Sequence, residues 1–200
     1  DKSTLNTINA AIQLENVDLL VLSDSCKDIC NELINIKNIN NIFIYENDAF
    51  KNQLAEDSAN FIAENFNDYT NILFSNTSNG KNIAPRLAGL LDTMIIPDVI
   101  EIVDKQTFKR PIYAGNAIAT CKSKNKINII TIRTTAFEEA EIGNENVGKI
   151  QEIGSLTTNN LTKYLNSELT KSERPELTTA DIVVSGGRGL GSAENFQILE

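Results

Sequence analysis

The sequence contains no histidine among its 200 residues. This absence excludes Ser-His-Asp and Cys-His nucleophiles, HExxH zinc sites and imidazole acid–base shuttles. Carboxylates, lysine, tyrosine or a bound cofactor remain as sources of chemistry. The pool of catalytic groups is therefore narrow, and neither a catalytic residue nor a metal site is predicted.

Long apolar runs are also missing. Hydrophobic residues make up 41% of the chain and charged residues 22%, spread too evenly to leave an 18-residue membrane span. The apolar fraction is nevertheless too high for a disordered chain, and the length suffices for a substantial core. No signal or transit peptide is visible, and no membrane insertion is expected.

Cysteine is scarce, and basic charge is outweighed by acidic charge. Three cysteines without a CxxC motif favour a reducing compartment over a disulfide framework. Cys26 and Cys30 lie four residues apart, which predicts two buried thiols on one helix face rather than a metal pair. The net charge of −9 argues against nucleic acid as a partner.

The first 92 residues alternate between helical and strand patterns. Apolar runs at 18–23, 42–45 and 72–74 predict buried strands, and amphipathic stretches at 25–36, 48–66 and 81–91 predict helices. Continuous apolar strands separated by helices are typical of a parallel sheet covered on both faces. The fold class is therefore α/β, with a mostly parallel, helix-covered sheet.

After Pro97 the pattern changes to closely spaced strands. Segments 99–103, 107–113, 117–121 and 127–133 predict an antiparallel meander attached to the sheet. Residues 140–160 are predicted to form a mobile surface loop, and 161–169 a short helix. Residues 172–180 are predicted to be a linker. After it, 182–184 is predicted to be a new strand that leads into a helix at 193–199.

Both ends of the sequence are predicted to be truncated. The chain opens with a helix, whereas such sheets normally open with a strand, and it ends inside a new strand–loop–helix unit. The opening strand of a doubly wound sheet tends to be central, so its absence should leave an apolar gap.

The strongest local motif is the glycine-rich segment 185–192, placed between the predicted strand and helix. Glycines there let the backbone approach an anion, and a central arginine favours a phosphate or an electron-rich ring. A strict G-x-G-x-x-G frame starting at Gly187 fails, because Ser192 occupies the last position. The pattern alone leaves both a binding loop and a tight strand-to-helix turn open. Ser78–Lys81 lacks the residues of a Walker loop and is read as a helix start.

A basic stretch runs from residue 105 to 133 without one acidic residue. We favour a solvated face with its turns; the alternative is a docking patch for an acidic partner. The cationic residues are Lys105, Lys109, Arg110, Lys122, Lys124, Lys126 and Arg133.

The segments 172–177, 182–190 and 194–196 closely resemble the domain junction of electron-transfer flavoprotein alpha subunits. Further resemblances lie upstream, in order along the chain, at 5–8, 80–82 with 85–86, 112–117 and 132–137. The resemblance implies an adenine-nucleotide-hydrolase-like α/β domain at 1–171, the linker at 172–180, and the incomplete start of an α/β FAD-binding domain at 181–200.

The same resemblance implies an electron carrier rather than a substrate-converting enzyme, because flavin performs the chemistry. Arg188 matches the family's first FAD-contacting arginine, and Gly187 and Gly189 flank it as cofactor-binding residues; most of the FAD site would lie beyond Glu200. AMP is expected in the beta subunit only.

The implied partners are the beta subunit of a heterodimer, acyl-CoA dehydrogenases that donate electrons in fatty acid beta-oxidation, and a quinone oxidoreductase that accepts them. The implied location is the cytoplasm in bacteria or the mitochondrial matrix in eukaryotes. Without the resemblance, a nucleotide- or anion-binding module or a subunit-docking module without redox activity remains open.

Overall fold

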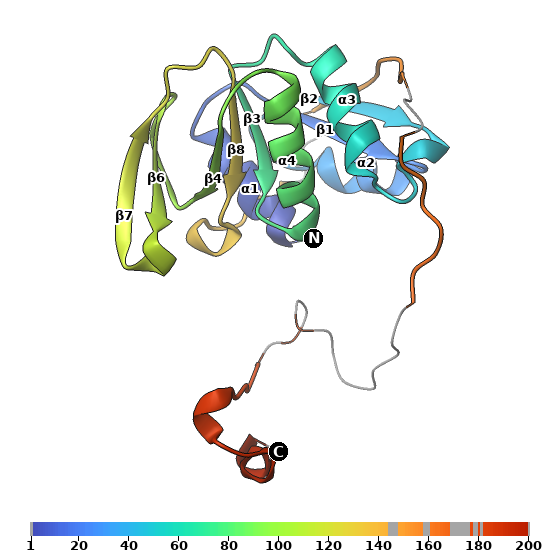
Figure 1. Cartoon of the computed structure of the whole chain (residues 1–200). Helices are drawn as coiled ribbons and strands as arrows, with labels where there is room; N and C mark the ends of the chain where they lie inside the picture. The colour runs from blue at the N-terminus through green and yellow to red at the C-terminus, as the bar shows by residue number, and fades with distance from the viewer. Residues whose placement is uncertain are drawn as a thin grey trace. The chain divides into compact units, whose positions relative to one another are not determined.

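The computed structural model divides the chain into two compact units, Asp1–Tyr164 (unit 1) and Leu165–Glu200 (unit 2). Figure 1 shows both, and each is described by itself. Of the predicted linker 172–180, only Leu177 and Ala180 lie within the described residues. The residues that the structure describes are 2–143, 148–157, 161–168, 177, 180 and 182–199.

The first sheet of unit 1 contains three parallel strands in the order β1 (Val17–Ser23), β2 (Ile39–Glu46) and β9 (Lys149–Glu152). β9 corrects the prediction that 140–160 is entirely a loop. Hydrophobic patterning does not detect this strand because its sequence is mostly polar. The polar sequence suits its position, since the strand lies at the sheet edge and all four residues are exposed.

The second parallel sheet has the order β3 (Asn71–Ser75), β8 (Asn128–Ile132) and β4 (Ile95–Val99). The predicted placement of 127–133 in the antiparallel meander is therefore wrong. All five residues of β8 are buried, because the strand has neighbours on both sides and layers on both faces.

The antiparallel sheet contains β5 (Glu101–Asp104), β6 (Thr107–Ile112) and β7 (Ala117–Lys122). The single strand predicted at 99–103 is instead divided at Ile100, with β4 in the parallel sheet and β5 in the antiparallel one. The register of β4 shifts beside Asp98, whose φ of 61° lies in the left-handed region and redirects the chain.

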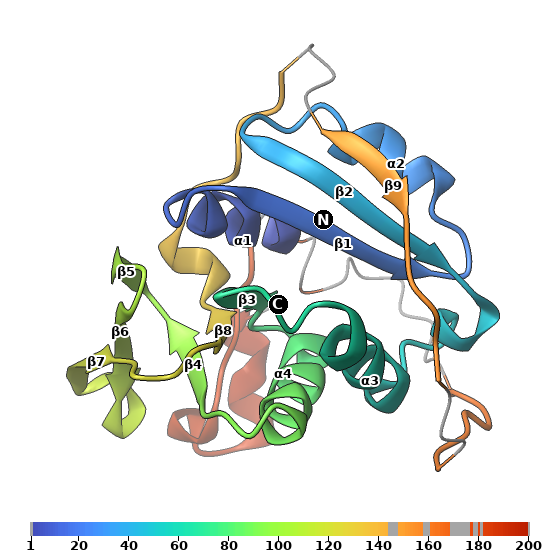
Figure 2. The ribbon, with the colours of Figure 1, turned by 90° about the horizontal axis from the view of Figure 1, so that it is seen from above.

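Helices cover both faces of the parallel strands, as Figure 2 shows. Val17 and Val21 of β1 pack in the core cluster of α1 (Lys2–Ile12) and α2 (Lys27–Leu33). Leu20 and Leu22, which point to the opposite face, pack against α3 (Ala55–Asn65) and α4 (Ser78–Leu90). The predicted α/β fold class is confirmed.

The helix predicted at 48–66 is interrupted. A 3-10 turn, η1, spans Asp48–Phe50, and Gln53 has a φ of 48° before α3 begins. The Asn47 side chain accepts a hydrogen bond from the Ala49 amide (3.0 Å) and so caps the short turn. Two further 3-10 turns of unit 1 are η2 (Tyr113–Gly115) and η3 (Thr134–Ala136).

Two predictions for the C-terminal part are wrong within the described residues. Residues 161–168 form no helix, and Ile182–Val184 form no strand. Ile182 and Val184 are 84% and 66% exposed, and no strand in the described part of the chain pairs with them. The helix predicted at 193–199 is the 3-10 helix η5 (Ala193–Leu199).

The predicted apolar gap is present, and it separates the two parallel sheets. β1 and β3 are edge strands, and a cleft of about 790 Å³ lies between them, lined by residues 17–22 of β1 and 70–75 at β3. α1 contributes Leu5, Ile8 and Ala11 to its lining. We call this space the inter-sheet cleft.

Asp18 connects the two sides of the inter-sheet cleft at its amino end. Tyr69, just before β3, donates a hydrogen bond of 2.5 Å to the Asp18 carboxylate. The same carboxylate accepts from the backbone and side-chain nitrogens of Asn41 on β2, at 3.0 and 2.8 Å. One side chain therefore joins β1, β2 and the entry to β3.

A second connection lies at the carboxyl end. Ser75, the last residue of β3, donates to the Ser3 carbonyl of α1 (3.1 Å), and its hydroxyl lies 2.8 Å from that of Thr7. The first turn of α1 is thereby fixed against the carboxyl end of β3.

Replacing Tyr69 by Phe should lower the free energy of unfolding of unit 1 by about 1–2 kcal/mol, because Asp18 loses one of its donors. Burial, and then the bond to Asp18, raise the pKa of Tyr69 above its ordinary value. The stabilisation is complete below the unfolded-state pKa of about 10 and is lost as the pH rises through the folded-state pKa.

Urea unfolding measured at several pH values between 7 and 11 checks this prediction, and the difference between wild type and Tyr69→Phe should narrow above about pH 10. Tyr45→Phe is the control, since no side-chain hydrogen bond of Tyr45 is found among the described residues. Equal losses in both variants would contradict a specific role for the Asp18 bond.

Candidate functional site

The three predicted cofactor-binding residues lie together in unit 2. Gly187 is the N-cap of η4 (Arg188–Leu190), and its carbonyl accepts a hydrogen bond from the Leu190 amide at 3.0 Å. Gly191 ends the turn with a φ of 80°, a left-handed conformation that favours glycine. We call residues 186–191 the glycine loop.

The backbone of the glycine loop is open where a ligand would approach. An added Cβ at Gly187 or at Gly189 would meet nothing within 4 Å. At Gly186 it would lie 2.4 Å from Leu190 and 2.6 Å from Leu199, so this glycine serves packing inside the unit. Arg188 is exposed, and its guanidinium is therefore accessible to solvent and ligand.

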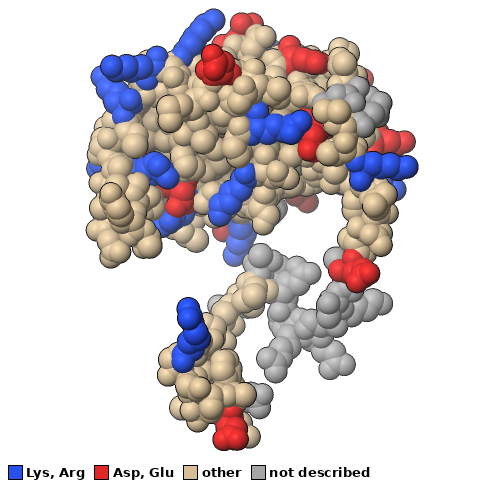
Figure 3. Space-filling model, in the orientation of Figure 1, with Lys and Arg blue, Asp and Glu red and all other residues tan. Residues whose placement is uncertain are grey.

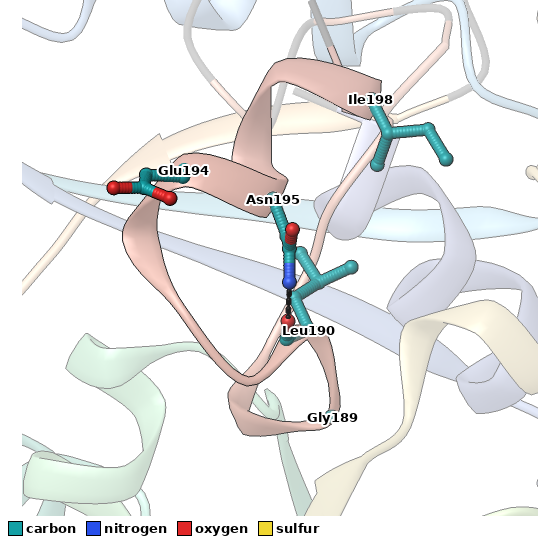
Figure 4. Close-up of a pocket in the computed structure, with 5 residues that line it drawn as sticks. All are labelled: Gly189, Leu190, Glu194, Asn195 and Ile198. Carbon is teal, nitrogen blue, oxygen red and sulfur yellow. Dashed lines mark hydrogen bonds between the residues drawn. The ribbon is translucent and has the colours of Figure 1, made fainter.

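A hollow of about 430 Å³ adjoins the loop (Figure 4). Asn195 of η5 points back to the loop and donates a hydrogen bond of 2.5 Å to the Leu190 carbonyl. The residues that line the hollow are Gly189, Leu190, Glu194, Asn195 and Ile198. The sequence had not singled out Asn195; its place after the loop, within a segment of family resemblance, was the available signal.

The basic stretch lies in unit 1 and is partly neutralised by acidic residues from other segments. Lys105 pairs with Glu15 and Lys109 with Glu101, both at 2.8 Å. Because these acids are distant in sequence or precede the stretch, the charge run alone did not reveal them.

Three lysines of the stretch remain without such partners. Lys122, Lys124 and Lys126 are exposed at the turn between β7 and β8, and no ion pair connects them to another part of the chain that the structure describes. Figure 3 shows basic side chains gathered at this end of unit 1. We call these three residues the lysine turn.

A polar cluster that the sequence analysis missed lies at the carboxyl ends of β3, β4 and β8. Asp98 accepts hydrogen bonds from Asn76 (2.7 Å) and from the Arg133 Nε (2.9 Å). Thr131 donates to the Asn76 side-chain carbonyl (3.1 Å) and accepts from the Asp98 amide (2.8 Å). These groups satisfy one another and hold the left-handed Asp98 in place, so the cluster is structural.

The buried thiols offer no nucleophile. Cys26 and Cys30 are 1% and 5% exposed, as the spacing predicted, and burial raises the pKa of both. The thiolate, which is the reactive form, is therefore disfavoured.

Comparison with known families agrees with the α/β fold of unit 1. Residues 1–155 match the family model described as the electron transfer flavoprotein domain, which is more than half of the chain. The chain belongs to this family. The family match, and not the fold by itself, places it in a class of flavoproteins.

Three similar proteins are named as alpha subunits. The electron transfer flavoprotein subunit alpha of Pseudomonas aeruginosa is 40% identical over 200 residues, which cover 98% of this chain and 64% of that protein. The corresponding subunit of Paracoccus denitrificans is 39% identical over 198 residues (99% and 64%). The mitochondrial subunit of Dictyostelium discoideum is 37% identical over 214 residues (99% and 60%). The chain thus spans less than two thirds of the length of these relatives.

Replacing Asn195 by Ala should loosen the glycine loop, because one bond between the loop and η5 is lost. We expect hydrogen exchange at the amides of residues 190–192 to accelerate about fivefold, corresponding to the net value of about 1 kcal/mol for one hydrogen bond. Glu194→Ala is the matched control, since Glu194 lines the same hollow without a side-chain hydrogen bond to the described residues. Equal exchange in both variants would contradict the role of Asn195.

Proposed function

We propose that this chain is part of the alpha subunit of an electron-transfer flavoprotein, which carries electrons through FAD. The observation that supports the proposal best is the exposed Arg188 between two glycines whose Cβ positions are open, in a chain of this family. FAD, when bound, would supply the redox chemistry. The protein's own part would be to hold and orient it.

The residues of the glycine loop are suited to making one polar contact with such a cofactor. Open space at Gly187 and Gly189 lets the backbone approach an anion, and the Arg188 guanidinium can pair with a phosphate or stack on a ring. The adjoining hollow of about 430 Å³ lies at the small end of ligand sites, and all the residues of the loop except Leu190 are exposed. Unit 2 therefore offers a contact rather than an enclosure.

The proposed donors are acyl-CoA dehydrogenases and related flavoenzymes, and the proposed acceptor is a quinone oxidoreductase. Relatives from bacteria and from mitochondria support the cytoplasm or the mitochondrial matrix as the compartment. Among the described residues, no helix combines the length and apolarity needed to cross a bilayer.

The proposed partner is a beta subunit, and unit 1 would serve to dock it. The lysine turn supports this part of the proposal, because three exposed cations without an ion pair to the described residues suit an acidic surface. A docking module without redox activity of its own is the second candidate, and it rests on the same lysines.

Replacing Arg188 by Ala in the complete subunit, assembled with its partner, should lower flavin occupancy, because a charge-assisted contact to the cofactor is lost. We expect the dissociation constant for FAD to rise about tenfold, measured by equilibrium dialysis and absorbance. Gln197→Ala, an exposed neutral position of the same unit, should leave it unchanged.

The 200 residues alone should bind FAD weakly or not at all, because ligand sites usually bury most of the ligand. A yellow one-to-one complex of this chain that survives gel filtration would contradict the assignment of most of the site to other segments. Unchanged flavin affinity in Arg188→Ala would remove Arg188 from the site.

Neutralising the lysine turn (Lys122→Gln, Lys124→Gln, Lys126→Gln) should slow association with a beta subunit roughly tenfold at low salt, with a smaller effect on dissociation. Stopped-flow or surface-binding kinetics at two ionic strengths measure both rates.

The matched control removes the same charge from other exposed lysines that form no ion pair with the described residues: Lys27→Gln, Lys51→Gln and Lys81→Gln. If both triple variants associate equally slowly, the association rate depends on net charge alone and not on the position of the lysine turn. An unchanged rate for the first variant at low salt would count against docking at this turn.

A further inference from the structure

β7 is an edge strand with one open side. The antiparallel sheet has the order β5–β6–β7, and no strand in the described part of the chain pairs with β7 on the side away from β6. In Figure 1 it is the outermost strand of this sheet. Its pairing with β6 runs from Thr107↔Lys122 to Ile112↔Ala117 without a register shift. The open side is therefore a regular backbone edge along all six residues of the strand.

The other edge strand of the same sheet, β5, is protected against further pairing. It contains four residues, two of them acidic, and its register with β6 shifts between Ile102 and Asp104. Short strands, irregular register and charged side chains are common means of keeping an edge from pairing with another chain. β7 contains neither a bulge nor a proline, and its single charged residue, Lys122, is its last. β7 is therefore the edge of this sheet that can accept another strand.

The hydrogen-bond pattern shows which residues of β7 direct their backbone groups to the open side. The Ser123 amide donates to the Gln106 carbonyl at 2.8 Å, next to the pair Thr107↔Lys122. Hydrogen-bonded and non-hydrogen-bonded pairs alternate along an antiparallel ladder. The residues of β7 that bond to β6 are therefore Ala117, Ala119 and Cys121. The residues whose N–H and C=O groups face the open side are Ile118, Thr120 and Lys122.

Two observations on β6 agree with this alternation. Pro111, which has no amide hydrogen, lies opposite Ile118, where no bond between β6 and β7 is expected. The Lys109 carbonyl accepts a hydrogen bond from the Ile100 amide (2.9 Å), which lies on the side of β6 away from β7. The free N–H and C=O groups of β7 thus belong to three alternate residues.

The side chains along the open edge differ between its two ends. Ile118 is 62% exposed, and Tyr113, in the turn that precedes β7, is 80% exposed. The lysine turn begins at the last residue of β7 and continues beyond it. The edge therefore has an apolar end, where β7 begins, and a cationic end, where it finishes.

We propose that the open edge of β7 binds an extended segment of a partner protein as a fourth, antiparallel strand, and that this segment carries carboxylates at its amino-terminal end. In strand addition, backbone hydrogen bonds supply affinity and alternate side chains supply specificity. An antiparallel segment begins where β7 ends, so its first residues would lie beside the lysine turn. The inference extends the docking role proposed above and rests on it for the charge of the segment.

The probe is the synthetic peptide Glu-Glu-Glu-Thr-Val-Thr-Val-Thr-Val, long enough to cover β7 with its glutamates beyond Lys122. Only alternate amides of a bound strand would face β7. N-methylation of one set, the three valines or the three threonines, should therefore raise the dissociation constant at least about tenfold, and N-methylation of the other set should change it little. Fluorescence anisotropy measures the binding to the unmodified chain. Equal binding of the two methylated peptides overturns the proposal.

Hydrogen exchange identifies the edge that is used. On addition of the unmethylated peptide, exchange at the amides of Ile118, Thr120 and Lys122 should slow about tenfold or more, whereas exchange in β1 should not change. Thr120→Pro removes one outward N–H without removing a bond to β6 and should weaken binding, and Thr120→Val is its matched control. Unchanged exchange at these three amides in the presence of bound peptide would place the peptide elsewhere and contradict the inference.

The charge of the segment is tested separately. Glutamine in place of the three glutamates should weaken binding about tenfold at low salt and much less at high salt. A peptide of nine glutamates that binds as tightly would show that charge alone is recognised, which overturns strand addition. Protection of the same three amides that rises with protein concentration in the absence of peptide would assign the edge to a second copy of the chain and overturn the acidic segment.

This proposal and the docking of a beta subunit fail separately. If neutralising the lysine turn slows association with a beta subunit while both methylated peptides bind alike, docking by charge stands and strand addition is wrong. If the methylated peptides differ as expected while association with the beta subunit ignores the lysine turn, β7 accepts an acidic strand that comes from another partner.

Discussion

The structure of unit 1 depends on how two parallel sheets are held together without a shared strand. The Asp18 carboxylate is the central group in this arrangement, because it receives donors from β2 and from the segment before β3. α1 provides the second connection through Ser75. Together with the apolar cluster in which α3 and α4 pack against strands of both sheets, these contacts position the second sheet relative to β1.

Hydrophobic patterning predicted the buried strands 18–23, 42–45 and 72–74, because continuous apolar runs have one stable place in such a fold. It failed for β8, whose sequence suits either a parallel or an antiparallel neighbour. The choice depends on β3 and β4, far along the chain, and on Thr131, which joins the polar cluster beside Asp98. Strand partners so far away along the chain leave no signal in the local sequence of β8.

The limits of prediction were similar in unit 2. The glycine loop was identified from its residues, and the structure gathers Gly187, Arg188 and Gly189 in one short turn. The adjacent residues 182–184 have strong strand propensity but form no strand, since a strand requires neighbours for its backbone groups. The glycine pattern therefore identified the loop correctly, whereas strand propensity predicted the wrong structure for the residues before it. The cofactor assignment rests on family resemblance, which geometry supports only as far as access to the backbone and to Arg188.

The lysine turn affects the electrostatics of unit 1. The chain as a whole carries a net charge of −9, yet three cations without ion pairs to the described residues stand together at one end of unit 1. Such segregation of opposite charges gives a protein an electric dipole moment. The field of an acidic surface would exert a torque on this dipole and turn the antiparallel sheet of unit 1 toward that surface before any side chains touch.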